Sequence, residues 1–134
     1  MRHGLDTDTQ AFLDSLSPPS PVPPSVAEMR DRESQMQAVD VARARVDVED
    51  GAVQSMGHEI SIRVVRPLGW KNGPLPAALF VHGGGWVVGG KDTHDRLVRD
   101  IACAAEVAIV FVDYSRSPEA RYPVAIEEVY AALA

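Results

Sequence analysis

The chain has 134 residues, the length of one ordinary domain with a single hydrophobic core. Its content of 46% hydrophobic and 24% charged residues is typical of a soluble globular protein. The formal net charge of −6 argues against nucleic acid or an anionic membrane as a partner. The first ten residues hold no apolar segment of the secretory kind, and the longest apolar runs have the length of strands. We therefore expect a cytoplasmic protein that binds neither nucleic acid nor membranes.

The single cysteine, Cys103, excludes an internal disulfide. It lies within an apolar pattern of helical spacing, so we interpret it as a packed, unreactive thiol rather than a nucleophile or a metal ligand. No residue pattern indicates a metal or an organic cofactor, and we predict none.

Residues 1–43 are expected to form a helical cap segment. Apolar residues in 5–16 recur at helical spacing and predict a first short helix. The proline-rich connector, residues 17–25, follows it, and five prolines favour an extended backbone. A proline-rich stretch can also be a recognition ligand, but we interpret this one as a stiff link between two helices.

A second helix is predicted from Ser25, because Ser25 and Glu28 have the spacing of a capping box. Its apolar side is marked by Val26 and Met29 but is interrupted by Glu33. Two short helices cannot bury both of their apolar sides against each other alone. We expect them to lean on the rest of the fold.

Residues 44–134 are expected to form the first part of an α/β core, incomplete in this chain. The segments 44–50 and 59–67 alternate apolar and polar residues. This period predicts an antiparallel pair of strands with one solvated face, joined by residues 51–58.

A parallel strand–helix–strand unit is predicted next. The runs 77–81 and 107–112 are continuously apolar, as in strands that are covered on both faces. Between them, apolar residues recur at helical spacing, and such a crossover joins parallel strands. These residues are Leu97, Val98, Ile101 and Ala105. A last helix is predicted from Pro123, with an apolar stripe of Ile126, Val129, Tyr130 and Leu133.

Three consecutive glycines, Gly83 to Gly85, stand where the first apolar run ends. Glycine loses more conformational entropy on folding than any other residue, so three in a row indicate a role for bare backbone. In open α/β sheets, ligands bind beyond the carboxyl ends of the strands. The spacing fits neither the G-x-G-x-x-G fingerprint nor the P-loop, which argues against a phosphate site. A His-Gly-Gly-Gly turn after a strand is instead typical of the oxyanion loop of lipases and esterases.

The motif HGGGW at residues 82–86, followed by DYSRSPEARYPVAIEEVYAAL at 113–133, resembles the hormone-sensitive-lipase-like branch of the α/β-hydrolases. That branch includes bacterial carboxylesterases and acetyl esterases. The resemblance runs from the N-terminal helices, which match the family's cap, to the last residue. It implies the N-terminal half of an α/β-hydrolase fold, with the antiparallel pair and the parallel unit preceded by a helical cap. Residues 115–117 depart from the commoner family form, Asp-Tyr-Arg-Leu-Ala-Pro-Glu, which weakens the subfamily assignment more than the reaction class.

The resemblance also implies roles for single residues. The N–H groups of Gly84 and Gly85 would be the oxyanion donors on this segment. Gly83 would shape the turn, and the side chain of His82 would brace the loop by hydrogen bonding. Trp86 would line the pocket for the acyl or the alcohol group. The substrate would be a short-chain carboxylic ester, hydrolysed through a covalent acyl-enzyme.

No nucleophile can be assigned within this chain. Esterases of this type need a serine on a G-x-S-x-G elbow, then an acid, then a histidine, and the pentapeptide is absent here. The nearest string, VQSMG around Ser55, has valine in place of the first glycine and lies between the predicted antiparallel strands. A compact triad of His82, Asp113 and Ser115 lacks the strained turn that would lift the serine hydroxyl. We interpret these three residues as structural.

We therefore interpret the chain as the N-terminal portion of a serine carboxylic ester hydrolase, inactive alone. By resemblance, strand 77–81 lies between strand 107–112 and a strand absent from this chain. An open apolar edge would pair with the C-terminal half of the hydrolase or lead to self-association, so isolated residues 1–134 are expected to be poorly stable or oligomeric. Two alternatives stay open: a non-catalytic small-molecule binding protein on the same scaffold, and an inactive truncated product that pairs with a second chain.

Overall fold

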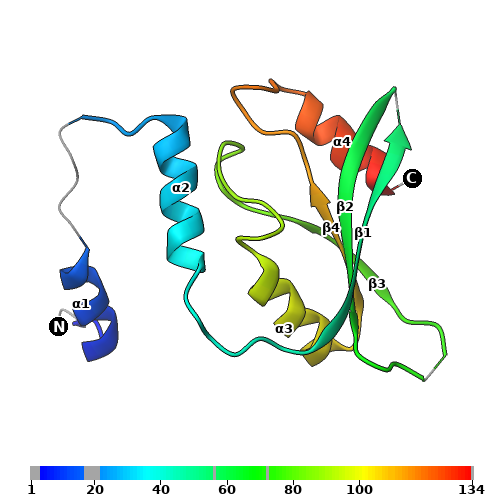
Figure 1. Ribbon diagram of the computed structural model, residues 1–134, viewed down its shortest axis with the longest axis horizontal. Helices are drawn as coiled ribbons and strands as arrows, with labels where there is room; N and C mark the ends of the chain where they lie inside the picture. Colours follow the sequence, from blue (N-terminus) through cyan, green and yellow to red (C-terminus); the bar gives the residue numbers. More distant parts are fainter. Residues whose placement is uncertain (1–3, 17–21, 56, 72, 134) are drawn as a thin grey trace.

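The structure, a computed structural model, describes residues 4–16, 22–55, 57–71 and 73–133 (Figure 1). Its helices and strands, in chain order, are α1 (Thr7–Ser15), α2 (Val26–Gln37), β1 (Val46–Ser55), β2 (His58–Pro67), β3 (Ala77–Val81), α3 (Asp95–Ala105), β4 (Ala108–Asp113) and α4 (Val124–Leu133). Most of the proline-rich connector predicted at 17–25 lies outside the described residues.

The two N-terminal helices are held at their starts by side-chain caps. The Asp6 side chain accepts the N–H groups of Asp8 and Thr9 at the start of α1. At the start of α2 the predicted capping box is present: Glu28 donates its N–H to Ser25 Oγ at 3.2 Å, and its carboxylate accepts the Ser25 N–H at 2.7 Å. Neither helix has a buried residue, and α1 stands clear of the sheet in Figure 1. Apolar packing of these helices on the core is therefore limited to half-buried residues of α2 such as Val26 and Met29.

The described strands form one mixed sheet in the order β1-β2-β4-β3. The predicted antiparallel pair is confirmed, with Val46 opposite Pro67 and Ser55 opposite His58. The hairpin is longer than predicted, because most of residues 51–58, predicted as a connection, extends the two strands. Cross-strand hydrogen bonds thus override the weak strand propensity of these residues.

The predicted strand–helix–strand unit is also confirmed. β3 and β4 run parallel, with Ala77 opposite Ala108 and Val81 opposite Val112, and α3 connects them. β4 in turn pairs antiparallel with β2. β3 is therefore an edge strand of the described sheet, and the carboxyl ends of β3 and β4 lie side by side.

Two buried clusters cover opposite faces of the sheet. Along β4, Ile109 and Phe111 pack with Val98 and Ala102 of α3, whereas Val112 packs with α4 on the other face. Figure 1 shows α3 and α4 on either side of the strands. The second cluster reaches the carboxyl end of β4, where it includes Val112 and Tyr114.

The helical faces predicted from periodicity are only partly correct. On α3, Val98 is buried and Ile101 is half-buried, but Leu97 and Ala105 are exposed, and the row facing the core includes the charged residue Asp95. On α4, which begins at Val124 just after Pro123, the residues Ile126, Tyr130 and Leu133 are exposed. Periodicity identifies residues that share a face, but it does not identify which face meets a partner. No helix among the described residues has the length and apolar character needed to cross a membrane.

Candidate functional site

The glycine turn leaves β3 at its carboxyl end, beside the end of β4 (Figure 1). Gly84 has a φ of 126° and Gly85 a φ of 60°, both in the left-handed region, and Trp86 follows with a φ of 64°. A Cβ on Gly84 would overlap the backbone carbonyl of Val88. An added Cβ on Gly83 would meet no described atom within 4 Å, and Gly83 does not have a positive φ. Glycine is thus required most strictly at Gly84.

The turn leaves several backbone donors unused. The Gly84 carbonyl accepts the N–H groups of Val87 and Val88 at 3.1 and 3.0 Å, which closes the turn. Among the described residues, no acceptor takes the N–H of Gly83, Gly84 or Gly85. Successive free N–H groups at the end of a parallel strand can hold a negatively charged oxygen.

His82 lies beneath this turn and is only 3% exposed. Its Nδ1 is 2.7 Å from the Gly83 carbonyl oxygen, and the Tyr114 hydroxyl donates to the His82 carbonyl oxygen at 2.8 Å. The imidazole stacks on the Tyr114 ring with the centroids 4.2 Å apart, and on Phe111 at 5.5 Å. The Gly83 carbonyl can only accept, so Nδ1 carries the proton. Burial lowers the pKa of His82, and the ring is therefore neutral near pH 7.

We expect this histidine to make the protein less stable as the pH falls below about 6.5. The unfolded chain has the ordinary histidine pKa of 6.5, and burial lowers the pKa of His82 in the folded state. As the pH falls below 6.5, the imidazole of the unfolded chain is therefore protonated before the imidazole of the folded chain. Above pH 6.5 the buried neutral His82 costs the folded state no stability relative to the unfolded chain. As the pH falls from 6.5 towards the lower pKa of the folded state, the free energy of unfolding decreases.

The measurement is the thermal midpoint of the whole protein that carries this chain, followed from about pH 8 to about pH 5. The variant His82→Gln is expected to show a shallower decline over this window than the wild type. Equal declines in the two proteins would contradict the prediction.

Trp86 borders a cavity of about 330 Å³ next to the turn. Ser115, Tyr122 and Ile126 also line it. The Trp86 side chain is half-exposed, and its backbone carbonyl accepts the N–H of Ser117 at 2.8 Å. The cavity therefore lies between the glycine turn and the start of α4.

His82, Asp113 and Ser115 do not form a hydrogen-bonded triad in the described chain. The Ser115 hydroxyl donates to the Glu128 carboxylate at 2.8 Å, and the Ser115 N–H donates to the other Glu128 oxygen at 2.6 Å. Glu128 lies on α4 and is only 8% exposed. These bonds fix the segment after β4 to α4, which is a structural role. Ser55, the other serine considered, is the last residue of β1 at the hairpin.

Sequence analysis missed two residues that contact the turn. Glu33 of α2 accepts the N–H of Gly89 at 2.5 Å, and Arg30 donates to the carbonyl of Val87 at 2.9 Å. The only sequence signal was that Glu33 interrupts the apolar side of its helix. Cys103 has no comparable contact; it is half-buried, and its thiol lies 3.8 Å from the carbonyl oxygen of Arg45.

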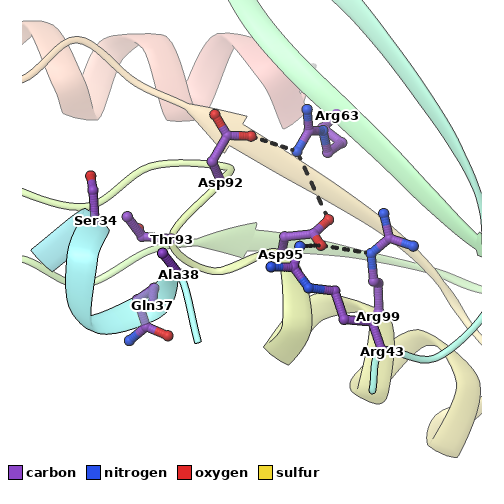
Figure 2. Close-up of a pocket in the computed structure, with 9 residues that line it drawn as sticks. All are labelled: Ser34, Gln37, Ala38, Arg43, Arg63, Asp92, Thr93, Asp95 and Arg99. Atoms are coloured by element: carbon purple, nitrogen blue, oxygen red, sulfur yellow. Dashed lines mark hydrogen bonds and ion pairs between the residues drawn. The ribbon is translucent and has the colours of Figure 1, made fainter. Parts of the chain in front are cut away.

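A second cavity, of about 460 Å³, is lined by residues of α2, of α3 and of the segments nearby (Figure 2). Its arginines are already paired. Asp95 accepts from Arg43 at 2.7 Å and from Arg99 at 2.8 Å, and Arg63 donates to Asp92 at 3.1 Å. Because these carboxylates neutralise the guanidinium groups, we interpret the cavity as structural rather than as an anion site. Within the described residues, no three His, Cys, Asp or Glu side chains are placed to share a metal ion.

Comparisons with known proteins identify this fold. The profile of a family with the alpha/beta hydrolase fold matches residues 78–134. The chain is 36% identical over 129 residues to the carboxylic ester hydrolase LipN of Mycobacterium tuberculosis, a match that covers 96% of this chain and 33% of LipN. It is 35% identical over 130 residues to a protein of Acanthamoeba polyphaga mimivirus described as an alpha/beta hydrolase, with 96% and 37% covered.

Solved structures agree with these matches. A thermostable esterase from Pseudomonas putida is 40% identical and superimposes with a TM-score of 0.89, over 97% of this chain and 42% of that chain. An esterase from Pyrobaculum calidifontis is 30% identical with a TM-score of 0.81, over 96% of this chain and 41% of that chain. The chain thus spans less than half the length of each of these relatives. It has the α/β-hydrolase fold and is similar to the N-terminal portion of these longer hydrolases.

Proposed function

We propose that the whole protein carrying this chain hydrolyses short-chain carboxylic esters, and that Gly84 and Gly85 supply two donors of its oxyanion hole. One observation carries the proposal. At the carboxyl end of β3, the backbone takes a left-handed path at both glycines, and no described acceptor uses their N–H groups. The carboxylic ester hydrolase LipN and the Pseudomonas putida esterase, which match nearly all of this chain, support the same reaction.

Such a turn acts on the charge that develops during ester hydrolysis. When a nucleophile bonds to the acyl carbon, the electron pair of the carbonyl double bond moves onto the carbonyl oxygen. Fixed N–H donors stabilise this oxyanion more than they stabilise the neutral ester, so they lower the barrier. His82, which bonds to the Gly83 carbonyl, and Tyr114, which bonds to the His82 carbonyl, hold the donors in place before substrate arrives.

The nucleophile in this proposal is a serine outside residues 1–134, activated by a histidine that takes its proton. The serine forms an acyl-enzyme and the alcohol leaves; water then releases the acid. The cavity beside Trp86, of about 330 Å³, would hold the acyl or the alcohol group. Residues 1–134 then contribute donors and a pocket wall, and are inactive alone.

The test compares turnover of p-nitrophenyl acetate by the whole protein and by residues 1–134 alone. We expect turnover by the whole protein only, because the chain alone lacks a G-x-S-x-G elbow. A fluorophosphonate probe should label one serine of the whole protein. Turnover by residues 1–134 alone would contradict the assignment. A whole protein that neither turns over the ester nor reacts with the probe would favour the binding-protein alternative.

A further inference from the structure

We propose that Arg30 and Glu33 of α2 are positioning residues for the oxyanion loop, which we define as residues 82–90. In this proposal α2 holds the loop in its reactive shape. The inference rests on the proposed function, since it assigns these two residues a part in the same reaction.

The first contact joins Glu33 to the far end of the loop. Its carboxylate accepts the N–H of Gly89 at 2.5 Å, across 56 positions of sequence. Gly89 has a φ of 92°, and a Cβ there would lie 2.5 Å from His82 Nδ1 and 2.6 Å from the Gly83 carbonyl oxygen. The Cα of Gly89 therefore lies close to the hydrogen bond between His82 and Gly83, with no room for a side chain between them. A contact that fixes the position of Gly89 therefore also helps to fix the hydrogen bond between His82 and the Gly83 carbonyl.

The second contact joins Arg30 to the middle of the loop. Its Nε donates to the Val87 carbonyl at 2.9 Å, and its Nη2 donates to the Ser117 carbonyl at 3.0 Å. Val87 donates its own N–H to the Gly84 carbonyl at 3.1 Å. The rigid guanidinium plane thus ties the turn at Gly84 to the segment that follows β4.

A salt bridge keeps the guanidinium in this orientation. Both Glu119 oxygens accept from Arg30, each at 2.8 Å, in a bidentate pair. The Arg30 hydrogen bond lowers the pKa of Glu119 to about 2, so the pair stays charged at neutral pH. The Gly89 carbonyl accepts from Arg116. The N–H and the carbonyl of Gly89 are therefore each bonded to a charged side chain.

The way in which α2 is docked distinguishes positioning from ordinary packing. No residue of α2 is fully buried or belongs to either core cluster, although Val26 and Met29 are half-buried, so hydrophobic burial fixes α2 on the core only weakly. Its described contacts with the loop are instead charged side chains bonded to loop backbone groups. A contact of this kind adds little to global stability but sets the positions of peptide groups. Small errors in the placement of catalytic donors lower the rate by large factors.

The experiment uses the whole protein with Glu33→Ala, Glu33→Gln and Arg30→Lys. The matched controls are Asp31→Asn and Arg32→Ala, which change exposed residues of the same helix whose side chains make no hydrogen bond or ion pair with the described residues. The readouts are kcat and KM for p-nitrophenyl acetate, the thermal midpoint, and hydrogen exchange of the loop amides. The exchange readout needs no enzymatic activity.

We expect Glu33→Ala to lower kcat about tenfold or more, with KM within about twofold of the wild type. Glu33→Gln keeps a neutral acceptor and should lose less, and Arg30→Lys keeps the charge but loses the two-carbonyl bridge. Exchange of the loop amides should rise in all three variants while the thermal midpoint changes little. The two controls should match the wild type in every readout.

The outcomes separate this inference from the proposed function. If the wild type is active and the three variants keep kcat within about twofold, the positioning role is wrong and the proposed function stands. If kcat falls only in step with a lower thermal midpoint, the role is structural and the inference is overturned. If the wild type shows no esterase activity, the proposed function fails and the positioning role falls with it, whatever the exchange rates show.

Discussion

Gly84→Ala is expected to lower kcat/KM of the whole protein for p-nitrophenyl acetate by about 10²–10³-fold. Gly84 has a φ of 126°, a conformation that side chains rarely allow, and its added Cβ would overlap the Val88 carbonyl. The backbone has to move to relieve this overlap. That movement displaces the N–H groups proposed to stabilise the oxyanion, so the effect falls on the chemical step.

The measurement is steady-state kinetics together with the rate of fluorophosphonate labelling. Gly51→Ala is the control, because a Cβ at Gly51 in β1 would make only an ordinary contact, 3.9 Å from Ile62 Cγ1. It should have kcat/KM close to the wild type. A Gly84→Ala protein that remains folded with turnover within about threefold of the wild type would show that the loop does not stabilise the oxyanion.

Asp95→Ala is expected to lower the free energy of unfolding by about 3 kcal/mol, at the lower end of the range for breaking a buried ion pair. Asp95 is only 4% exposed and accepts from Arg43 at 2.7 Å and from Arg99 at 2.8 Å. Arg63, which is largely buried, is 3.9 Å away (Figure 2). Removing the carboxylate leaves these cations without their shared partner. The lower end applies because Arg43 is 44% exposed and water can solvate it.

Urea unfolding of the whole protein measures this effect. Asp100→Asn, on the same helix, is the control, because Asp100 is 52% exposed and its ion pair with Arg96 is 3.7 Å long. The control should lose less than about 0.5 kcal/mol. If Asp95→Ala loses no more than the control, the cluster in Figure 2 does not contribute to stability in the way its burial indicates.

Local patterns were sufficient to predict most of the elements. The capping box at Ser25 marked the start of α2, strand alternation marked the β1–β2 pair, and two apolar runs marked the parallel unit around α3. These signals depend on residues close in sequence, whose spacing alone defines a helix or a strand. The motif at residues 82–86 likewise placed the glycine turn at the end of a strand and indicated the α/β-hydrolase fold by resemblance.

The tertiary structure decided which residues support that turn and which helical faces are buried. Glu33 meets Gly89 across 56 positions and Arg43 meets Asp95 across 52, and no periodicity links residues so far apart. The same limit explains why Leu97 was placed on a buried face although it is 49% exposed. A sequence by itself determines its local elements and short motifs, because their physics is local. Long-range contacts of charged side chains exist only after the backbone has brought distant segments together, so only the folded chain reveals them.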